Sequence, residues 1–191
     1  MTFSSGRDNE RGELWEHLGS EVLLETPYFK LRTDRLRLPD GVVKDSYYVI
    51  ERQDAVFVLA VTESGEVPLV RQYRPPLKQM ELCLPAGLVD EGEEPFAAAR
   101  RELLEETGYS GGEWELVTRL SSSPGLKANW AHVYLARGVE PVASLDLDEF
   151  ERLEVVNVPL ERLGELVRSG EIISSSGVAG ILLALERLGE G

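Results

Sequence analysis

The residues best suited to chemistry in this sequence are the carboxylates that crowd the segment from Gly87 to Tyr109. Proline suits the first turn of a helix and glycine suits its C-terminal cap, and this segment carries Pro95 and Gly108 at those places. We therefore expect a helix from about Glu94 to Thr107. That helix follows a glycine turn dense in acids, so it begins where acidic side chains are already gathered.

Three glutamates, Glu102, Glu105 and Glu106, share one face of the predicted helix. Like charges one turn apart repel, whereas a hard cation with oxygen ligands reverses that effect. Arg101 lies one turn before Glu105 and can pair with it, which leaves Glu102 and Glu106 as the candidate metal ligands. The alternative is an acidic face that only meets water, which is the common reason for a run of charges.

The segment resembles the signature of the Nudix hydrolases, G-x5-E-x7-R-E-U-x-E-E-x-G-U, in which U is a large aliphatic residue. The positions in register are Gly87, Glu93, Arg101, Glu102, Leu103, Glu105, Glu106 and Gly108. Only the last position departs from the pattern, because Tyr109 stands where an aliphatic residue is usual.

In that family water attacks one phosphorus of a nucleoside diphosphate linked to a further group, with the assistance of Mg²⁺ or Mn²⁺. The resemblance implies that Glu102, Glu106 and the carbonyl of Ala86 bind the metal. For Glu105 three roles stay open: holding Arg101, binding a further metal ion, or orienting the water. The resemblance also implies a base from an acidic loop outside the signature, and Glu149 is our candidate for it.

Three further features resemble the ADP-ribose pyrophosphatase branch of the family: the stretch from Arg71 to Pro75, the stretch from Leu84 to Glu93, and Pro124. Arg74 matches an arginine that contacts a substrate phosphate, and Arg71 is a weaker candidate. Pro124 lies sixteen residues after Gly108, where that branch carries a proline beside the terminal ribose.

Two departures from the branch bear on substrate contacts. Cys83 stands where relatives carry glutamate, and Glu81, two residues earlier on the same strand face, is the candidate to replace it. Lys127 to Asn129 replace an acidic pair, which argues against a base from that loop. We interpret Cys83 itself as a small buried residue.

Composition limits the partners of this chain of 191 residues. Its net charge of −14 argues against a nucleic-acid backbone or an anionic membrane as partner. A small anionic substrate remains possible if metal ions and arginines neutralise it locally. One cysteine permits no internal disulfide, and with no apolar signal segment at the N-terminus this favours the cytoplasm.

Apolar and polar residues alternate in the opening third, which predicts a small antiparallel sheet with strands before and after the turn at Pro39 to Gly41. Ala55 to Thr62 is expected to form a buried central strand. After the signature, the next element is expected over Trp114 to Ser121. We expect an N-terminal region of residues 1–53 before a Nudix domain of residues 54–191. The predicted class is α+β, an α/β/α sandwich with a mixed sheet.

The sequence therefore predicts a Mg²⁺-dependent pyrophosphatase that converts ADP-ribose to AMP and ribose 5-phosphate. One alternative is the same reaction on ADP-glucose or GDP-mannose. Another is a nucleotide sensor that keeps the pocket without the chemistry. The resemblance further implies a homodimer in which the opening sheet of one subunit helps to line the site of the other.

Overall fold

The chain divides into two compact units in a computed structural model that describes residues 14–147 and 152–189. The first unit contains residues 14–52 and 123–128, and the second contains the other described residues. The loop that carries Pro124 therefore belongs to the same unit as the N-terminal strands.

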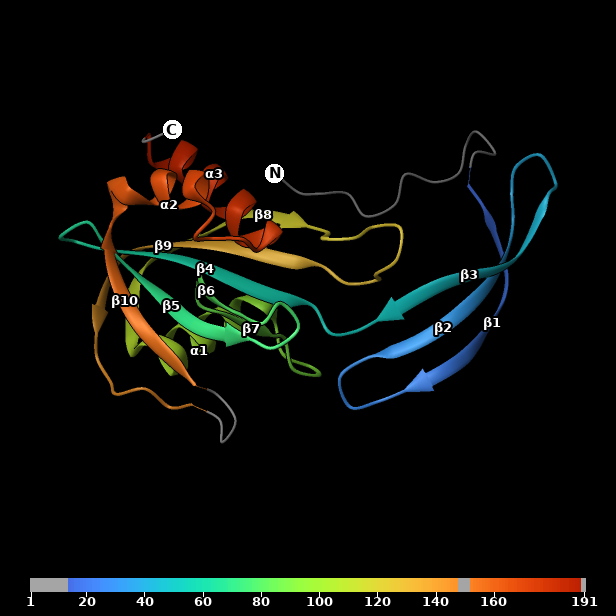
Figure 1. Ribbon diagram of the computed structural model, residues 1–191, viewed down its shortest axis with the longest axis horizontal. Helices are drawn as coiled ribbons and strands as arrows, with labels where there is room; N and C mark the ends of the chain where they lie inside the picture. Colours follow the sequence, from blue (N-terminus) through green and yellow to red (C-terminus); the bar gives the residue numbers. More distant parts are fainter. Residues whose placement is uncertain (1–13, 148–151, 190–191) are drawn as a thin grey trace. The chain divides into compact units, whose positions relative to one another are not determined.

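The first unit is a three-stranded antiparallel sheet in the order β1-β2-β3 (Figure 1). Its strands are β1 (Glu16–Glu25), β2 (Lys30–Arg37) and β3 (Val43–Glu51). The predicted turn joins β2 to β3, and Gly41 there has a φ of 87°, which favours glycine. The expected small antiparallel sheet is confirmed.

Backbone hydrogen bonds attach the 123–128 loop to β3. Ile50 N–H donates to the carbonyl of Leu126 at 2.8 Å, and Ala128 N–H donates to the carbonyl of Ile50 at 3.0 Å. The hydroxyl of Tyr47 donates to the carbonyl of Gly125 at 2.8 Å. The Pro-Gly turn is thus fixed to the sheet by three hydrogen bonds.

A buried carboxylate joins the strands of this sheet. Asp34 on β2 accepts hydrogen bonds from the guanidinium of Arg32 at 2.8 and 3.0 Å and from the hydroxyl of Ser20 on β1 at 2.6 Å. The hydrogen bond from Arg32 lowers the pKa of Asp34 to about 2, with a further contribution from Ser20 and against the effect of burial.

The second unit contains a mixed four-stranded sheet in the order β7-β4-β9-β8, with β4 and β9 parallel and the other pairs antiparallel. Its strands are β4 (Ala55–Thr62), β7 (Ala86–Leu88), β8 (Tyr109–Leu120) and β9 (Ala131–Pro141). A three-stranded sheet has the order β10-β5-β6. Its strands are β5 (Glu66–Arg74), β6 (Gln79–Cys83) and β10 (Leu153–Pro159).

Helices cover both faces of the four-stranded sheet (Figure 1). They are α1 (Pro95–Thr107), a 3₁₀ turn η1 (Leu160–Arg162), α2 (Leu163–Ser169) and α3 (Ser175–Leu188). Val58 of β4 packs in one core with Leu103 of α1, whereas its neighbour Leu59 packs in the other core with Ile181 of α3. Because side chains alternate along a strand, β4 is buried on both faces. The predicted sandwich with a mixed sheet is confirmed.

Strand boundaries differ from the sequence prediction in one place that affects the site. We expected β8 to start near Trp114, but it begins at Tyr109, directly after α1. Gly111 and Gly112 both lie within the strand with positive φ. A Cβ on Gly112 would lie 2.4 Å from the carbonyl oxygen of Arg137 on β9, so this glycine permits close strand pairing rather than a turn. Strand β7 was not predicted, whereas the strand expected at Glu81 and Cys83 is β6.

Candidate active site

Helix α1 begins and ends where the sequence predicts. Glu94 is its N-cap residue and Gly108, with a φ of 75°, closes its C-terminus by donating to the carbonyl of Leu104. A Cβ on Gly108 would lie 2.2 Å from the carbonyl oxygen of Ala143, so glycine is also required for the approach of the following loop. Asp146 N–H donates to the carbonyl of Glu105 at 3.0 Å, which fixes that loop against the last turn of the helix.

Two of the three glutamates on the acidic face of α1 are buried. Glu102 is 9% exposed and Glu106 is 3% exposed, although both carry carboxylates. A carboxylate is costly to bury unless it is paired or binds a cation. The alternative of an acidic face that only meets water is therefore wrong for these two residues. Glu106 accepts a hydrogen bond from the backbone N–H of Ala86 at 2.8 Å, which brings the start of β7 against the helix.

Gly87 gives Glu102 the space that its carboxylate occupies. A Cβ added to Gly87 would lie 2.0 Å from the carboxylate carbon of Glu102 and from one of its oxygens. No side chain can occupy that space without displacing the glutamate. The first glycine of the signature thus sets the position of the second of its acidic side chains.

Arg101 uses all its N–H bonds within the signature. Its Nε and Nη2 donate to the two carboxylate oxygens of Glu93 at 3.1 and 3.0 Å, and Nη2 also donates to the carbonyl of Leu88 at 3.0 Å. Its Nη1 donates to Glu102 at 2.7 Å and to Glu105 at 3.0 Å. The hydrogen bond to Glu93, followed by those to Glu102 and Glu105, raises the pKa of Arg101, and the same pairing lowers the pKa of Glu93.

The pairing of Arg101 with Glu105 is the one that the sequence predicts. The structure adds Glu102 to it, so the expectation that Arg101 leaves Glu102 unpaired is wrong. The reason is geometric, since one guanidinium nitrogen lies between two carboxylates and donates to both.

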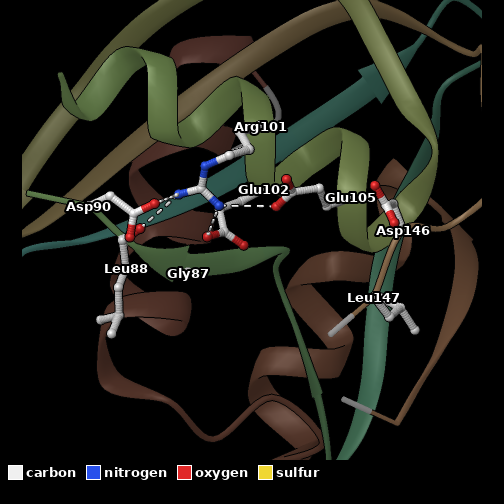
Figure 2. A pocket seen from close by; sticks show the side chains of 8 residues that line it. All are labelled: Gly87, Leu88, Asp90, Arg101, Glu102, Glu105, Asp146 and Leu147. Carbon is white, nitrogen blue, oxygen red and sulfur yellow. Dashed lines mark hydrogen bonds and ion pairs between the residues drawn. The ribbon is translucent and has the colours of Figure 1, made fainter. Parts of the chain in front are cut away.

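A pocket of about 520 Å³ opens beside these groups. Figure 2 shows the carboxylates of Asp90, Glu102 and Glu105 arranged around the guanidinium of Arg101. The residues that line the pocket are Gly87, Leu88, Asp90, Arg101, Glu102, Glu105, Asp146 and Leu147. Asp90 and Asp146 were not among our sequence candidates. Asp146 stands in the acidic stretch that we noted, but only the hydrogen bond between its N–H and Glu105 identifies it as the residue beside the helix.

The donor chemistry of this pocket fits a hard divalent cation. Glu102 and Glu105 line it, and Gly87 leaves room for the carboxylate of Glu102. Glu106 is not among the lining residues, but its carboxylate accepts from the N–H of Ala86, which precedes the lining residue Gly87. Within residues 14–147 and 152–189, no three acidic, histidine or cysteine side chains form a ready-made metal cage. Arg101 supplies the positive charge between Glu102 and Glu105 in this arrangement.

The second group of predicted residues lies on the β5–β6 hairpin. Arg74 Nε donates to a carboxylate oxygen of Glu81, and Nη2 lies 3.7 Å from the sulfur of Cys83. Although burial favours the neutral form, the hydrogen bond to Glu81 raises the pKa of Arg74. Cys83 is buried as expected, and burial raises the pKa of its thiol to about 11.

The remaining candidates lie elsewhere. Arg71 forms an exposed ion pair with Glu154, at 3.6 Å, on the neighbouring strand β10. Pro124 belongs to the unit that contains the N-terminal sheet. Glu149 lies outside the described residues.

Comparison with known families assigns both parts of the chain. The model of the NUDIX domain matches residues 51–173. The chain belongs to the Nudix hydrolase family. A second model, the nucleoside diphosphate sugar hydrolase N-terminal domain, matches residues 15–50, which contain the three-stranded sheet.

Relatives of this Nudix hydrolase cover nearly the whole chain. A Mycobacterium tuberculosis protein named ADP-ribose pyrophosphatase is 34% identical over 170 residues, which are 88% of this chain and 82% of the relative. A Bacillus methanolicus protein named methanol dehydrogenase activator is 31% identical over 175 residues, covering 89% and 93% of the two chains. A solved structure of an ADP compounds hydrolase matches with a TM-score of 0.80 and 25% identity, covering 93% and 97%.

Proposed function

We propose that this Nudix hydrolase cleaves the pyrophosphate bond of a nucleotide sugar, and that its preferred substrate is ADP-ribose, which it converts to AMP and ribose 5-phosphate. The observation that carries the proposal is the burial of two carboxylates, Glu102 and Glu106, on one face of α1 beside a glycine that gives one of them room. Carboxylates one turn apart on a helix repel each other, a divalent cation with oxygen ligands relieves that repulsion, and Nudix hydrolases generally use divalent metal ions.

The residues of α1 each have a definite task in this reaction. Glu102 and Glu106 are the proposed ligands of Mg²⁺ or Mn²⁺, with the carbonyl of Ala86, and Arg101 fixes the spacing of Glu102 and Glu105. The bound metal ion supplies charge neutralisation of the pyrophosphate and a more acidic water. Glu149, three residues after Asp146 in the sequence, is the proposed base that takes the proton of the attacking water.

The charges that line the pocket explain why a cation is needed. Asp90, Glu102, Glu105 and Asp146 carry negative charge, and Arg101 is already committed to several of them. A pyrophosphate brought into this pocket meets repulsion unless divalent cations neutralise it. Metal dependence therefore follows from the residues of the pocket as well as from the family.

The choice of ADP-ribose is supported by the names of relatives and by the position of the Arg74 guanidinium. A relative that matches 88% of this chain is named ADP-ribose pyrophosphatase. Arg74, the proposed phosphate contact, has a partly exposed guanidinium at the end of β5.

The experiment is a comparison of kcat/KM for ADP-ribose, ADP-glucose, GDP-mannose and NADH at one Mg²⁺ concentration, with identification of the products. We expect ADP-ribose to give the highest value and to yield AMP and ribose 5-phosphate. Another best substrate would overturn the choice of ADP-ribose. Binding without hydrolysis of all four compounds would instead indicate a nucleotide sensor.

We also propose that the active form is a homodimer. Large apolar side chains of the N-terminal sheet unit are exposed, among them Leu14, Trp15, Val22, Leu23, Leu24, Tyr28 and Tyr48. A three-stranded sheet exposes this much apolar surface when another protein surface covers it. A second copy of the same chain is the occupant that we propose.

A further inference from the structure

The pair formed by Arg74 and Glu81 combines an exposed cation with a buried anion. The side chain of Arg74 is 39% exposed, whereas that of Glu81 is 4% exposed. Both residues lie on one face of the β5–β6 hairpin, and the sulfur of Cys83 adjoins the same guanidinium. The carboxylate of Glu81 accepts from Nε of Arg74 and can therefore fix this cation, whose exposed side remains open to a substrate.

This pair adjoins the acidic helix. Cys83, which the guanidinium of Arg74 contacts, precedes Ala86 by three residues, and Ala86 N–H binds the carboxylate of Glu106. The end of β5 and the catalytic face of α1 are thus linked through one short segment of chain.

Arg74 also has N–H bonds to spare. Its Nε donates to Glu81 and its Nη2 contacts Cys83, while Nη1 donates to none of the residues that the structure describes. Arg101 differs, since Glu93, Glu102, Glu105 and a backbone carbonyl occupy all its donors. A phosphate oxygen that needs a cationic donor therefore finds it at Arg74 and not at Arg101.

We propose that Glu81 is a positioning residue, which holds the guanidinium of Arg74 toward a substrate phosphate without touching the substrate. The inference rests on the proposed function. A fixed guanidinium loses less rotational freedom when it binds phosphate than a free one does. The carboxylate charge opposes this gain, because it repels phosphate and partly neutralises Arg74. Glu81 therefore acts through the hydrogen bond that it accepts from Arg74 Nε, and not through its charge.

Two variants of Glu81 separate the hydrogen bond from the charge. Glu81→Gln removes the charge and keeps an oxygen that accepts from Arg74 Nε, whereas Glu81→Met removes both at similar volume. We expect Glu81→Met to raise KM for the best of the four nucleotide sugars by about tenfold with kcat nearly unchanged, because one charge-assisted hydrogen bond is lost. Glu81→Gln is expected to raise KM by less than Glu81→Met does.

A double variant tests whether Glu81 acts through Arg74. Arg74→Lys keeps the charge but not the guanidinium fork, so Glu81→Met is expected to have little further effect on KM in that background. Glu115→Gln is the control, because it releases Arg137 from an ion pair on the other sheet and is expected to leave KM unchanged. Circular dichroism and the melting temperature of each variant check its fold.

The outcomes distinguish this inference from the proposed function. Wild-type protein that hydrolyses none of the four compounds contradicts the proposed function. If the wild type is active, the positioning role is overturned by an unchanged or lower KM in Glu81→Met, by KM effects that add fully in the double variant, or by a loss confined to kcat. If the Glu81→Met protein does not fold, Glu81→Gln is combined with Arg74→Lys instead. Effects of these two substitutions on KM that add fully again overturn the role.

Discussion

Single residues of the signature act mainly by the room that they leave or occupy. At Gly87 the carboxylate of Glu102 occupies the space that a Cβ would take. At Gly108 the carbonyl of Ala143 lies where a side chain would be. Arg101 occupies the space between two glutamates that would otherwise repel each other. The positions of the Glu102 and Glu105 carboxylates thus depend on Gly87 and Arg101.

The substitution Gly87→Ala tests the first of these effects. Its Cβ would lie 2.0 Å from the Glu102 carboxylate, so we expect that carboxylate to move and the Mg²⁺-dependent kcat to fall by at least about tenfold. Gly87 is not one of the described glycines with a positive φ, so an alanine is not strained by the backbone there and the protein should still fold. Titration calorimetry should show that Mn²⁺ also binds more weakly to the substrate-free variant than to the wild type.

Gly164→Ala is the control for this prediction. The added Cβ in α2 meets only the flexible end of the Arg168 side chain, so metal binding and kcat should not change. Wild-type metal affinity in Gly87→Ala would show that Glu102 is not a ligand.

The elements differ in how well the sequence predicts them. Helix α1 was predictable to within a residue, because Pro95 and Gly108 mark its ends by backbone chemistry alone. Strand β4 was predictable because it is apolar along its length and both faces are covered. The start of β8 was not, because the positive φ of Gly111 and Gly112 and the close approach of Gly112 to β9 are not visible in an apolar–polar pattern.

The candidate site shows the same division. Glu102 and Glu106 were predictable from their helical spacing, since the helix places them on one face. Asp146 was not, because a hydrogen bond between its backbone and Glu105 places it there and no sequence spacing encodes that bond. The sharing of Arg101 between Glu102 and Glu105 likewise depends on rotamers, which a spacing rule does not contain.

The N-terminal sheet should lose stability in acid through Asp34. The folded-state pKa of about 2 lies below the ordinary value of 3.8, so its contribution is fully present above about pH 4 and disappears as the pH falls through about 2. We expect Asp34→Asn to destabilise the protein by about 2 kcal/mol near pH 7, and by much less near pH 2. Urea unfolding of both proteins at the two pH values measures the difference.

Asp45→Asn provides the comparison for this effect. Asp45 pairs with Arg35 at 2.8 Å, but both side chains are exposed, so the change should be small at either pH. A difference between wild type and Asp34→Asn that does not shrink in acid would mean that packing, and not charge, explains the loss.

The whole molecule combines a strongly acidic chain with an apolar N-terminal sheet. A net charge of −14 keeps separate copies apart at long range, so association must depend on the apolar side chains. No described helix is long and apolar enough to cross a bilayer. The exposed apolar side chains of the sheet are the reason that we propose a second copy of the chain as the cover for that surface.

Light scattering tests the dimer. We expect about twice the chain mass of 21.2 kDa at micromolar concentration. Val22→Lys combined with Leu24→Lys should shift the protein toward monomer, because both side chains lie half exposed on β1. Leu182→Lys in α3, equally exposed but in the other unit, should not. A monomeric wild type with full activity would contradict the dimer.

The most direct test of the account is the hydrolysis rate of Glu106→Gln at saturating Mg²⁺. Glutamine keeps an oxygen that can accept from Ala86 N–H but loses the charge that a divalent cation requires, so we predict a fall in kcat on the order of a hundredfold or more. The metal-free variant should melt at or above the wild-type temperature, because one repulsive charge is gone. Glu115→Gln, which only releases Arg137 on β9, should keep full activity. Near wild-type turnover in Glu106→Gln would contradict the assignment of the α1 carboxylates to the metal.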